Sequence, residues 1–185
     1  MPNPPDCEVS TFFISLPTSV SYAQIPAISG SFSSAFTVAL WVDIEALAPG
    51  QNSLVTVTAG GQSYNLLAVY GSYYGGPTLI ASWGNGSVNT DFTMDTWTYL
   101  VVTWDGTNLT LYVDGDEIGS VQPTTTSSVT NPAFTLGANA TMPPRSGSAG
   151  LFGGVRNFAY WSQVLTAAQI PTQMWTNSAT VSTNL

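Results

Sequence analysis

The segment from Trp97 to Ser120, WTYLVVTWDGTNLTLYVDGDEIGS, constrains the fold of this chain more than any other. Residues 97–104 place aromatic and β-branched side chains on both faces of an extended chain, as in a central strand of a sheet. Asp105-Gly106 and Asp114-Gly115 each follow an apolar run and supply residues that reverse a β-hairpin. The segment therefore predicts three consecutive antiparallel strands.

Alternating runs with short turns recur along the rest of the chain. Strands are expected within residues 10–26, 36–46, 52–71, 77–92, 133–140 and 151–165. A short helix is expected at residues 166–170, where Thr166 and Gln169 have capping-box spacing and Pro171 limits the length. Many short strands with almost no helix predict an all-β antiparallel sandwich or jelly roll, as one domain over residues 1–185.

Charge excludes several classes of function. The chain has 2 Lys and Arg residues against 10 Asp and Glu residues, a net charge of −8, one cysteine (Cys7) and no histidine. Nucleic-acid binding needs clustered cations, and imidazole catalysis and most zinc sites need histidine. We therefore expect no nucleic-acid partner and no cofactor. With only 6% charged residues, the surface is rich in hydroxyl and amide groups, which suit sugars or simply keep the protein in solution.

Targeting signals are weak. No apolar run reaches the roughly 18 residues of a membrane span, so no membrane insertion is expected. The first ten residues, MPNPPDCEVS, lack the basic and apolar regions of a signal peptide. The sequence predicts a protein that is cytoplasmic or exported without a classical signal, with an extracellular location as the alternative.

Four segments resemble the laminin-G-like members of the concanavalin A-like lectin/glucanase superfamily. They are FTVALWV, residues 97–120, FTLGAN and FGGVRNFAYWSQVLTAAQI, and the resemblance extends from about Phe36 to Ile170. It implies a jelly-roll sandwich of two curved antiparallel sheets that binds glycans or proteins, sometimes with calcium. Arg156 and Asn157 stand where many relatives have acidic residues, and Thr98 where many have His, so no metal ligand is carried over.

Acidic residues offer two other interpretations. Asp43 and Glu45 have the alternate spacing of a glycosidase pair, but the third carboxylate of the usual E-x-D-x-x-E run is missing, so we expect no enzyme. Asp114, Asp116 and Glu117 are interpreted as turn residues rather than as calcium ligands.

The predicted function is that of a carbohydrate-binding, lectin-like protein that uses aromatic stacking and neutral hydrogen bonds. A structural or protein-binding module is the alternative, and a glycoside hydrolase is the third hypothesis. Aromatic and amide side chains near glycines and turns are the expected ligand-binding residues. These are Tyr70, Tyr73, Tyr74, Trp83 and Asn85, with Asn139 and Arg145 on the loop before the last strand. Trp83 and Tyr70 have a second interpretation as core or cross-strand residues.

Assembly is predicted from uncharged strands. NSLVTV and TLIASW carry no charge and the chain has no Lys, whereas exposed edge strands are commonly protected by charge. We expect a homodimer in which such an edge is paired, with a monomer as the alternative.

Overall fold

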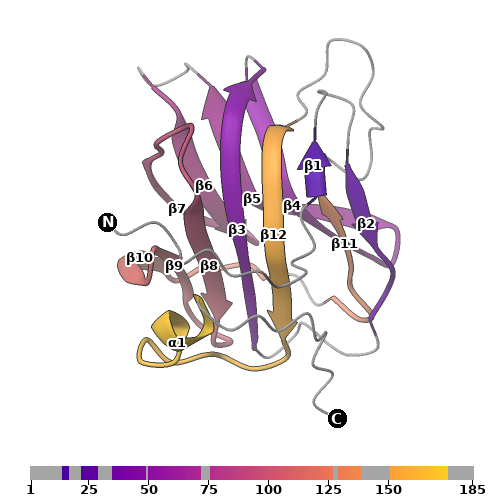
Figure 1. Cartoon of the computed structure of the whole chain (residues 1–185). Helices are drawn as coiled ribbons and strands as arrows, with labels where there is room; N and C mark the ends of the chain where they lie inside the picture. The colour runs from indigo at the N-terminus through magenta and orange to yellow at the C-terminus, as the bar shows by residue number, and fades with distance from the viewer. Residues whose placement is uncertain are drawn as a thin grey trace.

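The structure is a computed structural model that describes residues 14–16, 22–28, 35–48, 50–71, 76–126, 129–138 and 151–174. These residues form two six-stranded sheets packed face to face (Figure 1). The front sheet has the order β1(Ile14–Leu16), β12(Leu151–Trp161), β3(Phe36–Leu47), β8(Thr98–Trp104), β9(Leu109–Val113), β10(Asp116–Val121). The back sheet has the order β2(Ala23–Ile25), β11(Ala133–Leu136), β4(Gly50–Ala59), β5(Gln62–Gly71), β6(Thr78–Trp83), β7(Gly86–Asp91). The predicted antiparallel jelly-roll sandwich is confirmed.

The segment of residues 97–120 forms β8, β9 and β10, as its alternation and its two Asp-Gly turns predict. Adjacent strands of this meander pair antiparallel, with Leu100 opposite Val113 and Tyr112 opposite Glu117. At the second reversal, Asp114 (φ 53°) and Gly115 (φ 92°) adopt the left-handed conformation of a tight hairpin turn. The main-chain N–H of Tyr99 donates to Asp114 Oδ1 at 2.8 Å. Asp114 is therefore a turn residue.

The core lies between the two sheets. Alternate residues of β3 and β8 face the back sheet and are fully buried: Phe36, Val38, Leu40, Val42, Ile44, Leu100 and Val102. Buried side chains of β4, β5 and β6 complete it: Leu54, Val55, Val57, Leu66, Leu67, Val69, Leu79 and Ala81. Strand alternation thus assigns half of each central strand to the core.

The short helix α1(Ile170–Met174) covers part of the outer face of the front sheet (Figure 1). Ile170 packs with Trp41 and Tyr99 in a second apolar cluster, and the Trp41 indole Nε1 donates to the Met174 carbonyl at 3.2 Å. The described residues contain no helix with the length and apolar character that a membrane crossing requires.

The helix begins later than predicted. Gln169 Oε1 accepts a hydrogen bond from the Thr166 main-chain N–H at 2.9 Å, so the predicted capping pair forms. The α-helical residues nevertheless start at Ile170, and Pro171 lies in the first turn instead of ending the helix. Proline is tolerated there because the N–H groups of a first helical turn have no partner within the helix.

Both uncharged strands lie inside the back sheet. NSLVTV falls in β4, which pairs with β11 and β5, and TLIASW is β6, which pairs with β5 and β7. Among the described strands, the edges are β1, β10, β2 and β7. β10 carries Asp116 and Glu117 and a register shift between Glu117 and Gly119, and both features protect an edge. The two strands on which the homodimer prediction rests are therefore internal, and the homodimer stays a prediction.

Strands β12 and β3 of the front sheet approach each other closely at Gly153, where β12 shifts register against β3. Gly153 has a φ of 142°, and a Cβ there would overlap with the carbonyl oxygen of Asp43. Gly153→Ala is expected to lower the free energy of unfolding by roughly 3 kcal/mol or more, measured by urea denaturation.

Gly61→Ala is the matched control for this substitution. Gly61 also has a positive φ of 77°, but no atom lies within 4 Å of a Cβ built there. It should cost about 1 kcal/mol, the conformational penalty alone. Equal losses in the two variants would contradict the close approach of β12 to β3.

Candidate functional site

Trp83 is a core residue and not the exposed platform that the sequence predicts. Its side chain is only 1% exposed, and its ring lies 5.1 Å from the Phe36 ring and 5.6 Å from the Tyr64 ring. Successive side chains of β6 point to opposite faces of the back sheet, and Trp83 is on the face that packs against the front sheet. The interpretation of Trp83 as a core residue is therefore the correct one.

Asn85 joins the two sheets at one side of the sandwich. Its Oδ1 accepts hydrogen bonds from the main-chain N–H groups of Thr124 at 2.9 Å and Thr125 at 3.1 Å. Its Nδ2 donates to Thr124 Oγ1 at 2.7 Å. These residues follow β10, whereas Asn85 is in the β6–β7 turn. The Asn85 amide therefore forms a structural link between the sheets, and its assignment as a ligand-binding residue stays a prediction.

The other predicted site residues are separated or lie outside the described residues. Tyr70 is partly buried and pairs with Thr78 at the start of β6, whereas Asn85 follows the end of that strand. Five strand steps of about 3.3 Å place them roughly 17 Å apart, too far for one monosaccharide to touch both. Tyr73, Tyr74, Asn139 and Arg145 lie outside the described residues and remain predictions.

A different set of polar and aromatic side chains meets on the outer face of the front sheet. Trp41, Asp43 and Glu45 share that face because they alternate with the core residues of β3. In the adjacent strand β12, Arg156 lies opposite Trp41, and Gly154, which has no side chain, lies opposite Asp43. We call Asp43, Glu45, Asp95, Trp97 and Arg156 the outer-face site.

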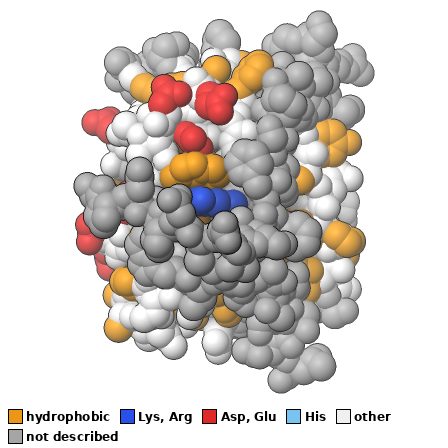
Figure 2. All heavy atoms as spheres, in the orientation of Figure 1, with side chains coloured by type: hydrophobic (Ala, Val, Ile, Leu, Met, Phe, Trp, Pro, Cys, Tyr) orange, Lys and Arg blue, Asp and Glu red, His pale blue; other side chains and the backbone are white. Residues whose placement is uncertain are grey.

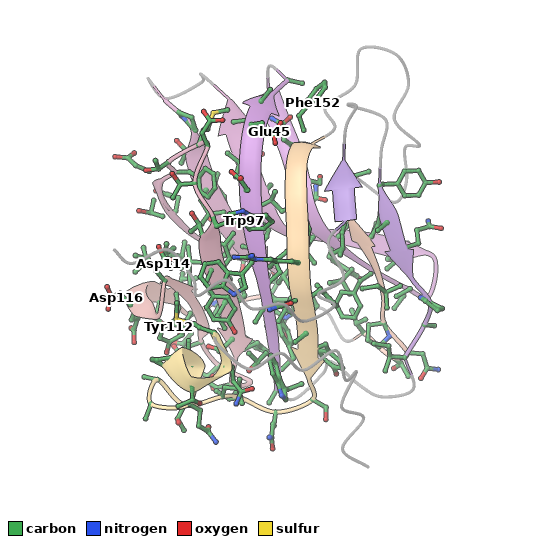
Figure 3. All side chains as sticks on the ribbon, in the orientation of Figure 1. Glu45, Trp97, Tyr112, Asp114, Asp116 and Phe152 are labelled. Carbon is green, nitrogen blue, oxygen red and sulfur yellow. The ribbon has the colours of Figure 1, made fainter. Side chains whose placement is uncertain are left out.

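The segment before β8 completes this site. The main-chain N–H of Asp95 donates to the Ile44 carbonyl at 2.9 Å, which holds the Asp95 segment beside β3. Trp97 directly precedes β8, and Figure 3 shows it on the same face as Glu45. Figure 2 shows acidic, hydrophobic and cationic side chains following one another down this face.

Arg156 stacks on two indole rings. Its guanidinium carbon lies 4.1 Å from the centre of the Trp97 ring and 5.2 Å from the centre of the Trp41 ring. Burial lowers the pKa of Arg156, and the charge of Asp43 partly opposes that shift. Among the described residues, Arg156 makes these ring contacts and no hydrogen bond or ion pair. No acceptor in the described part of the chain takes up its five N–H donors.

Asp43 carries an unsatisfied hydrogen-bond acceptor. Its Oδ1 is buried and has no hydrogen-bond partner within the residues that the structure describes. Burial raises the pKa of the Asp43 carboxyl, and the charges of Glu45 and Asp95 raise it further, whereas Arg156 acts in the opposite direction. As far as the described ranges go, one face of the sheet thus carries an acceptor without a donor and donors without an acceptor. Such orphaned groups cost stability and commonly mark sites that a ligand completes.

The acidic residues of the β9–β10 hairpin lie apart from this site. Figure 3 shows Tyr112, Asp114 and Asp116 beside α1, below Glu45 and Trp97. Within the described residues, no three His, Cys, Asp or Glu side chains come together as a metal site would require.

The alternation of Trp41, Asp43 and Glu45 is the sequence signal for this site. It places an aromatic residue and two carboxylates on the face of a strand whose other face is entirely apolar. In the sequence, Asp43 and Glu45 have the spacing of a glycosidase pair but lack the third carboxylate of that motif. Their connection to Arg156 is not visible there, because it depends on the pairing of β12 with β3.

The comparisons with known proteins identify a family and a fold. A family model described as the concanavalin A-like lectin/glucanases superfamily matches residues 17–171. No curated protein matches the chain.

Several solved structures share the fold at low sequence identity. A native heptameric SAP-like pentraxin from Limulus polyphemus is 13% identical with a TM-score of 0.58, over 84% of this chain and 82% of its own. The ligand binding domain of botulinum neurotoxin serotype D, in complex with N-acetylneuraminic acid, is 14% identical with a TM-score of 0.60, over 82% of this chain and 39% of its own. A Trypanosoma rangeli sialidase in complex with 2,3-difluorosialic acid is 15% identical with a TM-score of 0.58, over 84% of this chain and 28% of its own. At such identities the likeness establishes the fold alone.

Replacing Asn85 should affect stability and not binding. Asn85→Ala removes three hydrogen bonds of an exposed turn and is expected to lower the free energy of unfolding by about 1 kcal/mol. Asn89→Ala, on the exposed face of the same hairpin, is the control and should cost less. Thermal denaturation checks both, and a loss of ligand binding in Asn85→Ala with unchanged stability would contradict the structural role.

Replacing Asp43 should stabilise the unliganded protein at neutral pH. Because the folded-state pKa of Asp43 is raised above its ordinary value of 3.8, its contribution to stability is fully present below that value and is lost as pH rises through the folded pKa. Asp43→Asn removes this loss. Its advantage over the wild type should therefore appear at neutral pH and vanish below about pH 3.8.

Denaturation at a series of pH values measures this advantage. Asp91→Asn, at the exposed end of β7, is the control and should show no comparable pH-dependent gain. If Asp43→Asn were less stable than the wild type at every pH, the carboxylate would have a structural role instead.

Proposed function

The chain belongs to the concanavalin A-like lectin/glucanase superfamily, and from this we propose that it is a glycan-binding domain whose ligand occupies the outer-face site. The observation that carries the proposal is the pair of unsatisfied groups on one face of the front sheet. Asp43 Oδ1 lacks a donor, and the Arg156 guanidinium lacks an acceptor among the described residues.

A sugar has the chemistry that both groups need. Each hydroxyl group can donate one hydrogen bond and accept others, so neighbouring hydroxyls of one ring could donate to Asp43 and accept from Arg156. The partly exposed indole of Trp97 supplies apolar surface beside these polar groups, a combination typical of small-ligand sites. Trp41, only 5% exposed, supports Arg156 from within the second apolar cluster. A purely apolar ligand would leave both polar groups unsatisfied.

The structural neighbours are compatible with this proposal. The serotype D neurotoxin domain holds N-acetylneuraminic acid, and the sialidase holds a sialic acid derivative. Both share the fold at low identity, so they support a glycan as the general kind of ligand. They carry neither a residue nor a preference for an acidic sugar over to this chain.

A glycoside hydrolase is the second candidate, favoured by one observation. Asp43 and Glu45 alternate on β3, and the pKa of Asp43 is raised by burial and by its acidic neighbours, as in the acid of a glycosidase pair. We place binding first because Arg156 occupies the ring surface between the indoles instead of pairing with a carboxylate. Release of reducing sugar from a bound oligosaccharide would reverse this order.

The binding test compares the outer-face site with the predicted loop. A glycan array identifies a ligand, and calorimetry then measures its affinity for three proteins: the wild type, Arg156→Gln and Tyr73→Ala. Arg156→Gln removes the stacked guanidinium and is expected to weaken binding by about 1 to 3 kcal/mol, a size typical of hot-spot residues. Tyr73→Ala should bind as the wild type does.

Circular dichroism and the melting temperature verify that both variants fold. If Tyr73→Ala weakens binding and Arg156→Gln does not, the glycan binds the predicted loop and the outer-face assignment is wrong. If no glycan binds the wild type, the domain is a protein-binding or structural module.

A further inference from the structure

The outer-face site has an excess of negative charge. Asp43 interacts electrostatically with Arg156, and Glu45 and Asp95 interact electrostatically with Asp43. Three carboxylates and one guanidinium give the site a formal charge of −2. Glu45 and Asp95 are exposed, so they border the site at the side where a ligand approaches. No second cation is present among the described residues, since Arg145 lies outside them.

We infer that Glu45 and Asp95 are specificity-determining residues, which make the outer-face site select neutral glycans and reject glycans that carry a carboxylate or sulfate. This inference rests on the proposed glycan-binding function and names the ligand class within it. Specificity is often set by repulsion of the wrong ligand as much as by attraction of the right one.

The electrostatics of Asp43 support this selection. The charges of Glu45 and Asp95 both act on the Asp43 carboxyl and disfavour its ionised form, even with Arg156 nearby. A ligand carboxylate at the same place would meet the same charges. Arg156 alone would attract such a group, but the negative charge of Asp43 acts on the same guanidinium. The net field therefore opposes an anion.

A neutral sugar meets no such opposition. Its hydroxyl groups satisfy Asp43 Oδ1 and the Arg156 donors without adding charge. Protein charge acts in the same direction over longer distances, because the whole chain carries −8. Repulsion between exposed charges is screened by salt, so the selection should weaken as ionic strength rises.

The test uses a glycan array that contains neutral, sialylated, uronate-containing and sulfated glycans, including lactose with its 3′-sialyl and 3′-sulfo forms. Acidic oligosaccharides are also compared with their own methyl esters, which differ only in charge. The wild type is expected to bind neutral members at least about 10-fold more tightly than their acidic counterparts at low salt. The preference should shrink near 1 M salt, where the screening length is about 3 Å.

The Glu45→Gln/Asp95→Asn double variant tests the assignment of the two residues. It should gain about 3-fold to 10-fold in affinity for acidic members and keep its affinity for neutral ones. Asp91→Asn/Asp116→Asn is the matched control, because it also removes two negative charges, from exposed positions on β7 and β10. It should keep the wild-type preference for neutral glycans.

The outcomes separate this inference from the proposed function. If the wild type binds acidic glycans as tightly as neutral ones, the selection is wrong and glycan binding stands. If the wild type prefers neutral glycans and the double variant gains nothing for acidic ones, or the control variant gains as much, Glu45 and Asp95 do not set the selection. If no glycan binds, both proposals fail.

Discussion

Side chains leave the central strands of the front sheet alternately to its two faces, and β8 is buried on both along its whole length. The inner face of β3 and β8 packs against the back sheet. Their outer face packs against α1 at one end, through Ala39, Trp41, Tyr99 and Val101. Farther along β3 the same face presents Asp43 and Glu45. One face of β3 thus belongs to the core. Its other face packs against α1 at one end and contributes residues to the outer-face site at the other.

The sandwich can be predicted from the sequence because the patterns that mark its strands and turns are local. Alternation and Asp-Gly turns lie within a few residues of one another, so β8, β9 and β10 can be recognised without knowing what packs on them. Strand order is not local. The uncharged strand β4 is internal because β11, which is distant in the sequence, pairs with it. The uncharged strand β6 is internal because β7, which follows it after a turn, pairs with its other edge. The start of α1 is missed because a proline can begin a helix as well as end one.

The candidate site could be predicted only in part, for the same reason. The exposure of Trp83 depends on which face of β6 meets the front sheet, and the role of Asn85 depends on Thr124, 39 residues away. Asp43 and Glu45 stand out in the sequence as a pair of carboxylates on one strand face. Their partner Arg156 reads only as a departure from a family pattern, because its stacking on Trp41 and Trp97 arises from the pairing of β12 and β3.

Trp41 belongs to two neighbourhoods at once. Its ring contacts the Arg156 guanidinium, and its indole N–H donates to the last carbonyl of α1. A displacement of the Trp41 side chain would therefore change its contact with Arg156 in the outer-face site and its hydrogen bond to the docked helix. Linkage between two equilibria is reciprocal: whatever free energy ligand occupancy adds to helix docking, helix docking adds to ligand affinity. The helix would then act as an effector of the site, and a partner that pulls it from the sheet would change affinity without touching the ligand.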